Sequence, residues 1–456
     1  MTGDLLGDGR ELVPAVGGTR LVPAPDEAAR EYVVLALRLD QHAPGLVDGY
    51  YGPAALKAQV DLEQLRDPAR LADDAAALRE RVLRDVGEAD RRAWLVAQLT
   101  ALETQARGLA GTPLAYEEHV RRCFDWVPVR RDEQGFADAA AEIDALLPGK
   151  EPVADRLAAW DAAHTIPSDR VAAVADWLVA EFRNRSASLV GMPDRETLRV
   201  ALVRGAPWGA YNWYEGGRRS RVDINLDLPV RAADLVHTIG HETYPGHHLE
   251  HAWKEALLVD EAGRGEASIL LINTPECLIS EGLADVGPSL VLSAADDAAV
   301  LAELYPRAEL PFARDAGAAR ESAAIDSALR APRRRLGEAR VNAALQRHAD
   351  GATRDDVLAY LREVGRLPAE RAAKALEFIE HPLWRTYVFV YYEGAALLTR
   401  WLDDVPIADR PARFARLLRE QLTPTALAAE LTEPKVRQGD VARRDPVIGP
   451  PSIRTR

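Results

Sequence analysis

The sequence predicts a mainly α-helical fold, with a small antiparallel β-hairpin or sheet placed directly before a histidine-rich helix. Over most of the chain, apolar residues recur three and four positions apart, as on the buried face of a helix. One stretch between residues 198 and 226 instead alternates polar and apolar residues, as a half-buried strand does. A third observation concerns function, because five of the ten histidines fall between His237 and His251.

Composition favours a soluble globular protein, since 47% of the 456 residues are hydrophobic and 28% are charged. The formal net charge of −14 disfavours a nucleic-acid-binding protein, which needs a basic surface for phosphates. Cys123 and Cys277 are too few for a disulfide framework or a thiolate zinc site, and we expect two buried thiols. No signal peptide and no run of about 18 apolar residues is present, so we expect a cytoplasmic protein without a membrane partner.

The chain is expected to form one helical domain flanked by two irregular ends. Residues 1–26 are rich in Gly and Pro and predict a loosely ordered N-terminal arm. Residues 27–434 form the predicted domain, and residues 435–456 a weakly patterned C-terminal tail. Within the domain, helices are expected at about residues 27–41, 54–112 (two or three helices), 116–126, 133–195 with breaks at Pro148 and Pro167, 296–348, 353–377 and 380–403.

Two stretches between these helices are predicted to form a loop and a set of strands. Residues 42–53 contain two Gly/Pro breaks and are expected to form a loop, which either plugs the end of a helix pair or lines the rim of a substrate cleft. Strands are predicted at Leu198–Val203, Tyr211–Tyr214 and Ser220–Leu226, and the second and third are joined by a Gly-rich turn. A long helix from about Ala232 follows, and it carries the histidines. After a break at Gly263 to Gly265, a helix containing Leu270, Leu271 and Ile272 is expected.

His241 and Glu242 are the centre of the histidine-rich stretch. Histidine is the commonest protein metal ligand, and a Glu beside a metal-activated water is the usual general base of metal-assisted hydrolysis. His237 lies four residues before His241, on the same helix face, and is interpreted as an outer contact, a substrate contact or a packing residue. The pattern therefore predicts a metal site.

The second histidine ligand is either His247 or His248. On an ideal helix His248 lies in line with His241, but Pro245 and Gly246 intervene. Proline lacks a backbone N–H and clashes with the carbonyl four residues earlier, so the helix must kink or bulge there. A kink can bring His247 beside His241 instead, and residue spacing alone leaves both possibilities open.

A hydrolytic zinc ion usually takes three protein ligands and leaves one position open for water. Glu281 is the predicted third ligand, with Glu276 and Glu250 as rival carboxylates. Asp285 follows Glu281 by one helical turn, where a carboxylate can accept a hydrogen bond from the second nitrogen of a ligating histidine. His247 to His251 also spells the inverted His-x-x-Glu-His pattern, which would leave His241 and Glu242 without a role.

The pattern His-Glu-x-x-Pro-Gly-His-His, followed by Glu-Gly-x-Ala, resembles the bacterial domain of unknown function family 885, which is similar to the gluzincin metallopeptidases. The resemblance implies a zincin-like helical domain with a deep cleft, one zinc ion and hydrolysis of peptide-like bonds. It further implies that His241, His247 and Glu281 hold the zinc, that Glu242 is the general base and that Asp285 is an outer-shell acid. The family's late Tyr-x-x-Gly is matched by Tyr391 to Gly394.

The expected function is therefore a zinc metallopeptidase or amidase acting on a peptide or peptide-like small molecule. The oxyanion that forms during hydrolysis needs a donor, and the candidates are Tyr391 or Tyr387, with Arg385 or His381 nearby in the sequence. The predicted hairpin could offer an edge strand to an extended peptide. Two alternatives remain: an iron or manganese enzyme using the same two His and one carboxylate, and a metal-binding protein without catalysis.

Overall fold

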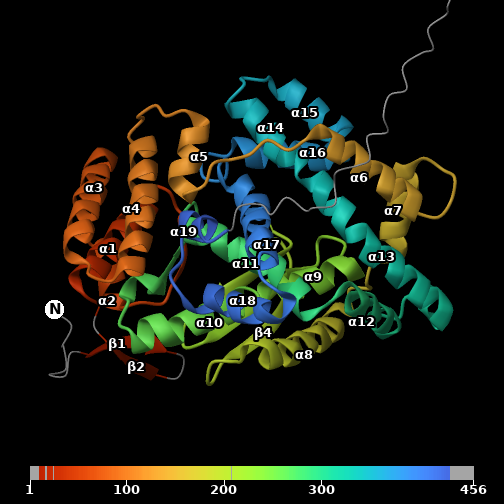
Figure 1. Ribbon diagram of the computed structural model, residues 1–456, viewed down its shortest axis with the longest axis horizontal. Helices are drawn as coiled ribbons and strands as arrows, with labels where there is room; N and C mark the ends of the chain where they lie inside the picture. Colours follow the sequence, from red (N-terminus) through yellow and green to blue (C-terminus); the bar gives the residue numbers. More distant parts are fainter. Residues whose placement is uncertain (1–9, 16–17, 24, 207, 432–456) are drawn as a thin grey trace, which may run out of the picture.

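The computed structural model describes residues 10–15, 18–23, 25–206 and 208–431. Most of these residues are helical, and the strands form small sheets, which confirms the predicted mainly α fold (Figure 1). Inside the predicted N-terminal arm, the backbones of β1 (Arg10–Ala15) and β2 (Gly18–Pro23) pair as an antiparallel hairpin. The predicted C-terminal tail, residues 435–456, lies outside the described residues.

The N-terminal helices pack side by side and agree with the predicted ranges. Two of them begin at aspartate caps: the Asp26 carboxylate accepts a hydrogen bond from the backbone N–H of Ala29, and Asp67 accepts from Ala69. Residues 54–112 contain three helices. The elements are α1 (Glu27–Asp40), α2 (Ala54–Asp61), α3 (Pro68–Asp85), α4 (Ala89–Leu109) and α5 (Tyr116–Phe124).

The next helices are separated at the predicted breaks. Pro148 and Pro167 lie between α6 (Glu133–Leu146), α7 (Val153–Ala163) and α8 (Val171–Val190). Both cysteines are buried free thiols, as predicted.

The sheet before the histidine-rich stretch is mixed rather than wholly antiparallel. β5 (Ala210–Tyr214) and β6 (Arg219–Asn225) form the predicted hairpin, but β4 (Thr197–Val203) pairs with β6 in the parallel direction. β6 is central because Val222 and Ile224 are buried, whereas the outer strands are more exposed. The strand order β4-β6-β5 leaves β5 at one edge of the sheet.

A second pairing was missed in the sequence. β3 (Val47–Tyr50) lies in the segment predicted to be a loop, and it pairs antiparallel with β7 (Ile269–Leu271), which was predicted to be helical. The prediction was wrong because a short apolar run fits either a strand or a helix, and only a distant partner selects the strand. The pairing brings residue 48 next to the histidine-rich region.

The histidine-rich stretch forms two helices instead of one long helix. α9 (Ala232–Glu242) stops before Pro245, and α10 (His247–Lys254) begins after it and continues into a π-helical turn, η1 (Glu255–Glu261). The following α11 (Pro275–Val291) is a central helix (Figure 1), and its Leu278 and Leu283 side chains are fully buried.

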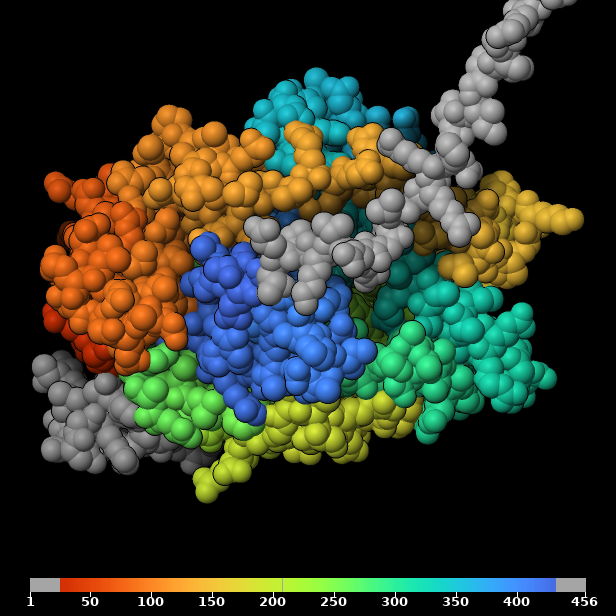
Figure 2. All heavy atoms as spheres, in the orientation of Figure 1, coloured from red at the N-terminus to blue at the C-terminus, as the bar shows by residue number. Residues whose placement is uncertain are grey.

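The C-terminal half is helical almost throughout. In Figures 1 and 2 its final segment, in blue, lies beside the N-terminal helices, in orange, and close to α10, in green. The remaining elements are η2 (Gly265–Ser268), α12 (Ala294–Arg307), η3 (Pro311–Arg314), α13 (Ala316–Gly337), α14 (Ala339–His348), α15 (Arg354–Glu363), α16 (Ala369–Glu380), η4 (Tyr387–Phe389), η5 (Val390–Gly394), α17 (Ala395–Asp403), η6 (Ile407–Asp409), α18 (Arg410–Arg419) and α19 (Pro424–Ala429).

Among the described residues, no single helix has the length and apolar character needed to cross a membrane. The pair α11 and α12 reaches that length only together, and it is bent by 84° at the junction.

Candidate metal centre

The break between α9 and α10 turns His247 toward His241. Their ring centroids lie 4.7 Å apart and the rings are nearly perpendicular, at 89°. Gly246 allows the sharp turn, because a Cβ at that position would lie only 1.8 Å from the carbonyl oxygen of His241. Any side chain at position 246 would therefore open the turn and separate the two histidines.

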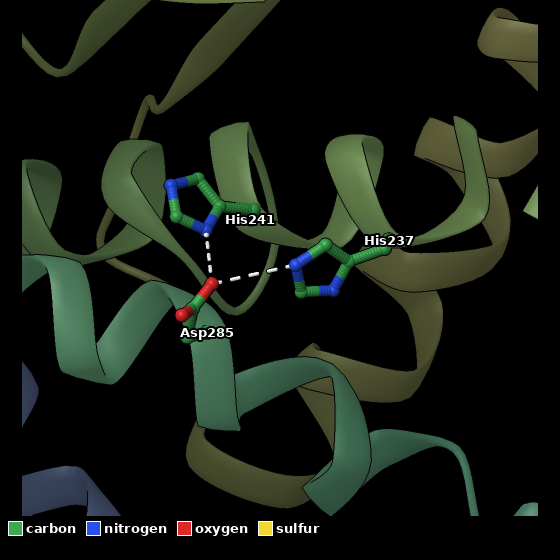
Figure 3. A group of neighbouring side chains, drawn as sticks. All are labelled: His237, His241 and Asp285. Atoms are coloured by element: carbon green, nitrogen blue, oxygen red, sulfur yellow. Dashed lines mark hydrogen bonds and ion pairs between the residues drawn. The ribbon is translucent and has the colours of Figure 1, made fainter. Parts of the chain in front are cut away.

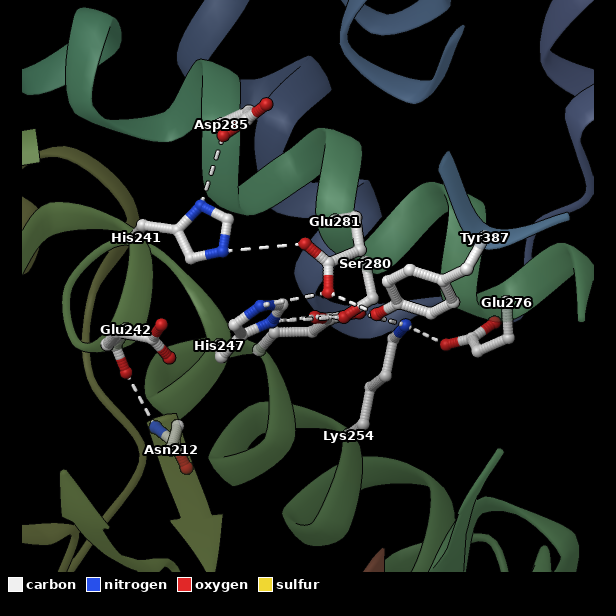
Figure 4. Close-up of polar contacts among 11 residues, drawn as sticks. Asn212, His241, Glu242, His247, Lys254, Glu276, Ser280, Glu281, Asp285 and Tyr387 are labelled. Carbon is white, nitrogen blue, oxygen red and sulfur yellow. Dashed lines mark hydrogen bonds and ion pairs between the residues drawn. The ribbon is translucent and has the colours of Figure 1, made fainter. Parts of the chain in front are cut away.

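Glu281 of α11 completes a group with these two histidines. Its Oε2 lies 3.5 Å from Nε2 of His241, and its Oε1 lies 3.8 Å from Nε2 of His247 (Figure 4). One ligand atom of each residue lies within 4.8 Å of the others. Oε2 of Glu281 is buried and has no hydrogen-bond donor among the described residues, although burying a carboxylate oxygen is costly unless it is paired.

The donor set fits a zinc ion. Two imidazole nitrogens and one carboxylate are a known set of protein ligands for catalytic zinc, with an open position left for water. The unpaired oxygen of Glu281 faces His241, so a cation between them would satisfy it. The residues present therefore have the chemistry to hold a metal ion.

Asp285 supports His241 from one side. Its Oδ1 lies 3.1 Å from Nδ1 of His241 and 3.3 Å from Nε2 of His237 (Figure 3). Burial acts to raise the pKa of Asp285, but hydrogen bonds from both histidines and the charge of Arg334 hold it well below its usual range. An ionised Asp285 fixes the His241 proton on Nδ1, which leaves Nε2 as the nitrogen free to bind a metal.

Ser280 supports His247 in the same way. Its Oγ lies 3.2 Å from Nδ1 of His247 and donates a hydrogen bond of 2.5 Å to Glu250. Glu250 also accepts from Nζ of Lys254 at 2.7 Å, and Lys254 pairs with Glu276 as well. The two rival carboxylates, Glu250 and Glu276, are thus occupied by one lysine.

Two other triads have metal-binding potential, but their atoms are engaged. The first group comprises His237, His241 and Asp285, and its carboxylate already accepts hydrogen bonds from both histidines. The second group comprises His247, Glu250 and His251, and its carboxylate accepts from Lys254 and Ser280. The inverted His-x-x-Glu-His pattern therefore offers a weaker ligand set than the one containing Glu281.

Two glycines allow the aromatic segment of residues 387–394 to pack closely against α11. A Cβ on Gly282 would lie 2.5 Å from the carbonyl carbon of Gly394, and one on Gly394 would lie 2.2 Å from the carbonyl oxygen of Leu278. This close approach places the Tyr387 hydroxyl so that it donates a 2.7 Å hydrogen bond to Oε1 of Glu281. The same contact brings Tyr391 to the wall of the adjacent pocket.

The group faces a pocket of about 420 Å³. Glu242 lines it, and burial raises the pKa of this carboxyl although the charges of His241 and His247 oppose the shift. The backbone carbonyl of Glu242 accepts a 2.6 Å hydrogen bond from the Asn212 amide (Figure 4). The Glu242 backbone is therefore fixed to β5 while its side chain faces the pocket.

Several pocket residues were not predicted as site residues. Asp48 of β3 and Tyr211 of β5 line the pocket, whereas residues 42–53 were expected either to plug the end of a helix pair or to line the rim of a cleft. Their membership depends on the two sheets, which the spacing of residues could not place. Ser280 and Lys254 were also missed, although both lie within a few residues of predicted ligands.

Two predicted site residues lie elsewhere. His248 is fully buried and faces the sheet, with Nδ1 2.9 Å from Ser220 Oγ and Nε2 3.1 Å from Glu196. Arg385 lines a different cavity, where it donates a 2.9 Å hydrogen bond to Nδ1 of His119. Neither side chain reaches the pocket that His241 lines, so the structure does not support His248 as the second ligand or Arg385 as a substrate contact.

Comparisons with known proteins give only distant structural neighbours. No protein-family model matches the chain, so the resemblance to domain of unknown function family 885 is not confirmed, and no curated protein matches either. A candidate lipoprotein of unknown function from Shewanella oneidensis aligns with 91% of this chain and 74% of its own, at 13% identity and a TM-score of 0.47.

Two further solved structures are similar at the same level. A candidate lipoprotein from Colwellia psychrerythraea shares 14% identity over 79% of this chain, with a TM-score of 0.45, and the alignment spans only 65% of that protein. An M32 carboxypeptidase from Deinococcus radiodurans R1 aligns with 89% of this chain and 94% of its own, at 14% identity and a TM-score of 0.39.

Proposed function

We propose that this protein is a zinc-dependent hydrolase of peptide or peptide-like amide bonds. In this proposal His241, His247 and Glu281 hold one zinc ion, Glu242 is the general base and Tyr391 stabilises the oxyanion. The observation that carries the proposal is the convergence of the Nε2 atoms of His241 and His247 on the carboxylate of Glu281, whose Oε2 is buried and unpaired, beside a pocket that Glu242 also lines.

A zinc ion held there would supply Lewis-acid activation of a water molecule and of the substrate carbonyl. Glu242 would accept the proton of that water, and its raised pKa suits the task, because a general base works best when its pKa approaches the working pH. It would then pass the proton to the leaving amine. Glu242 follows the ligand His241 directly and closes α9, so the base and the ligand share one rigid helix end.

Tyr391 is the better of the two tyrosines for the oxyanion. The Tyr387 hydroxyl already donates to Glu281, so it positions the proposed ligand. Tyr391 lines the pocket, is 37% exposed, and its hydroxyl forms no hydrogen bond with the part of the chain that the structure describes. A free phenolic O–H beside the metal group can donate to a developing negative charge.

The pocket walls favour a short peptide-like substrate. A pocket of about 420 Å³ is at the small end of the range that holds small-molecule ligands. Ala210, Tyr211 and Asn212 of the edge strand β5 line it, and an edge strand has backbone groups free to pair with an extended peptide. These features support amide bonds of short peptides over larger substrates.

The test is to measure the metal bound by the purified protein and the hydrolysis of a dipeptide library by the wild type and by Glu242→Gln. We expect one zinc per chain in both proteins and hydrolysis in the wild type only, because the isosteric amide cannot accept the proton. The control is Glu215→Gln, which lies outside this pocket and should leave both readouts unchanged. Iron or manganese in place of zinc, or equal hydrolysis by Glu242→Gln, would refute the proposal.

A further inference from the structure

Asp48 is an acidic side chain in the wall of the same pocket, and no cationic side chain of the described residues pairs with it. It belongs to β3, and its side chain is exposed to the pocket. Its carboxylate accepts a short hydrogen bond from the Tyr211 hydroxyl and forms no ion pair with any Lys, Arg or His among the described residues. A carboxylate in a confined pocket is stabilised most by a positive charge. The charge of His247 acts on Asp48 from a distance, but no cationic side chain of the described residues pairs with this carboxylate.

Tyr211, whose hydroxyl contacts this carboxylate, packs against a second aromatic ring. Trp208 and Tyr211 both line the pocket, and their rings are stacked with centroids 5.6 Å apart. Aromatic faces attract ammonium groups, so these rings and the nearby carboxylate together favour a cationic ligand in this part of the pocket. The Tyr211 hydroxyl also fixes the orientation of the Asp48 carboxylate.

Among the described residues that line the pocket, no lysine or arginine is left unpaired to bind a substrate carboxylate. Lys254 is the lysine among its lining residues, and its ammonium is neutralised by both Glu250 and Glu276. Asp48 therefore has no cation paired with it among the described residues, whereas Lys254 is paired with two carboxylates. This asymmetry favours the amino end of a peptide over its carboxyl end.

We propose that Asp48, Tyr211 and Trp208 form a subsite for a positively charged amino group of the substrate, so that hydrolysis takes place near the amino terminus of short peptides. This inference rests on the proposed function for its catalytic meaning, but the subsite itself is a binding site that can be measured without turnover. An amino group held by Asp48 would lie in the pocket that Glu242 and the proposed zinc ligands also line.

The experiment is calorimetric titration with probes that contain no scissile peptide bond. L-Leucinol carries the amino group, N-acetyl-L-leucinol lacks its charge, and N-acetyl-L-leucine carries a carboxylate instead. We expect the wild type to bind L-leucinol about tenfold more tightly than either acetylated probe, as expected for one hydrogen bond between charged groups. Equal affinity for the three probes, or a preference for the carboxylate, would overturn the inference without any variant being needed.

Variants then assign the preference to the subsite. Asp48→Asn is nearly isosteric and should abolish the preference, and Tyr211→Phe, which keeps the ring, should reduce it. The control Asp61→Asn removes an exposed acid on α2 that pairs with Lys57, and it should keep the full preference. Retention of the preference in folded Asp48→Asn would refute the assignment. Failure of the proposed function would appear separately, as absence of zinc or of hydrolysis with the probe preference intact.

Discussion

The adjacent residues His247 and His248 provide a matched pair for testing the proposed metal centre. Each is replaced by alanine in a separate variant. His247 faces His241 and Glu281, whereas His248 is fully buried against the sheet. The two variants remove the same atoms one residue apart, so the location of the side chain is the difference that matters.

The structure predicts a loss of zinc affinity for one variant and a loss of folding stability for the other. Loss of an outer contact already weakens metal binding by about 10–100-fold, so loss of the ligand His247 should weaken zinc binding by more than about 100-fold. His248→Ala should instead cost about 3 kcal/mol of folding stability, because it removes one hydrogen bond to the carboxylate of Glu196 and one to Ser220. The Glu196 carboxylate keeps its contacts with Arg183 and Tyr244, which limits the loss.

The assays are zinc content after dialysis against a zinc buffer and urea denaturation of the metal-free proteins followed by circular dichroism. His247→Ala should lose zinc and keep a urea midpoint near that of the wild type. His248→Ala should bind one zinc ion under native conditions and unfold at lower urea. If His247→Ala held zinc at the affinity of the wild type, or if folded His248→Ala lost it, the assignment of the second ligand would be wrong.

Three further predictions concern Ser280, Gly394 and His119. Ser280→Ala removes the support of His247 Nδ1 and should weaken zinc binding about tenfold or more, measured by competition with a chromogenic chelator. Gly394→Ala should destabilise the fold by about 2 kcal/mol, seen as a lower urea midpoint, because its Cβ would lie 2.2 Å from the Leu278 carbonyl oxygen. Burial and the charge of Arg385 lower the pKa of His119 from 6.5 to about 4. Unfolding therefore lets His119 take up a proton between these pH values, and the free energy of unfolding, which is unaffected above pH 6.5, falls as the pH falls toward 4. The loss should reach about 3 kcal/mol, and His119→Gln should flatten this part of the curve of unfolding free energy against pH. Unchanged zinc affinity, an unchanged midpoint or an unchanged pH curve would contradict the respective prediction.

Local patterns in the sequence were enough to predict most of the helices. Apolar residues on their buried faces recur every three to four positions, and Pro148 and Pro167 interrupt a helix whatever packs around them. The hairpin of β5 and β6 was predictable for the same reason, since its alternation and its turn lie within one short segment. The pairing of β3 with β7 was not, because the two strands are more than two hundred residues apart.

The sequence by itself determined which kinds of side chain make up the candidate site. Histidines beside a glutamate, a proline and glycine between the histidines, and a later Glu with Asp one turn on predict a metal group whatever the surrounding fold. Tertiary structure decided which of these side chains meet. The turn at Gly246 places His247, and not His248, beside His241, and Lys254 pairs with both rival carboxylates.

Tertiary structure also decided the walls of the pocket. Asp48 and Tyr211 come from different sheets, and Tyr387 reaches Glu281 only because Gly282 and Gly394 let two backbones touch. Arg385 shows the opposite case, because it lies two residues from Tyr387 and yet faces another cavity. The spacing of residues along a chain determines which side chains share a face within about one helical turn. Contacts between distant segments depend on tertiary packing, which this spacing does not encode.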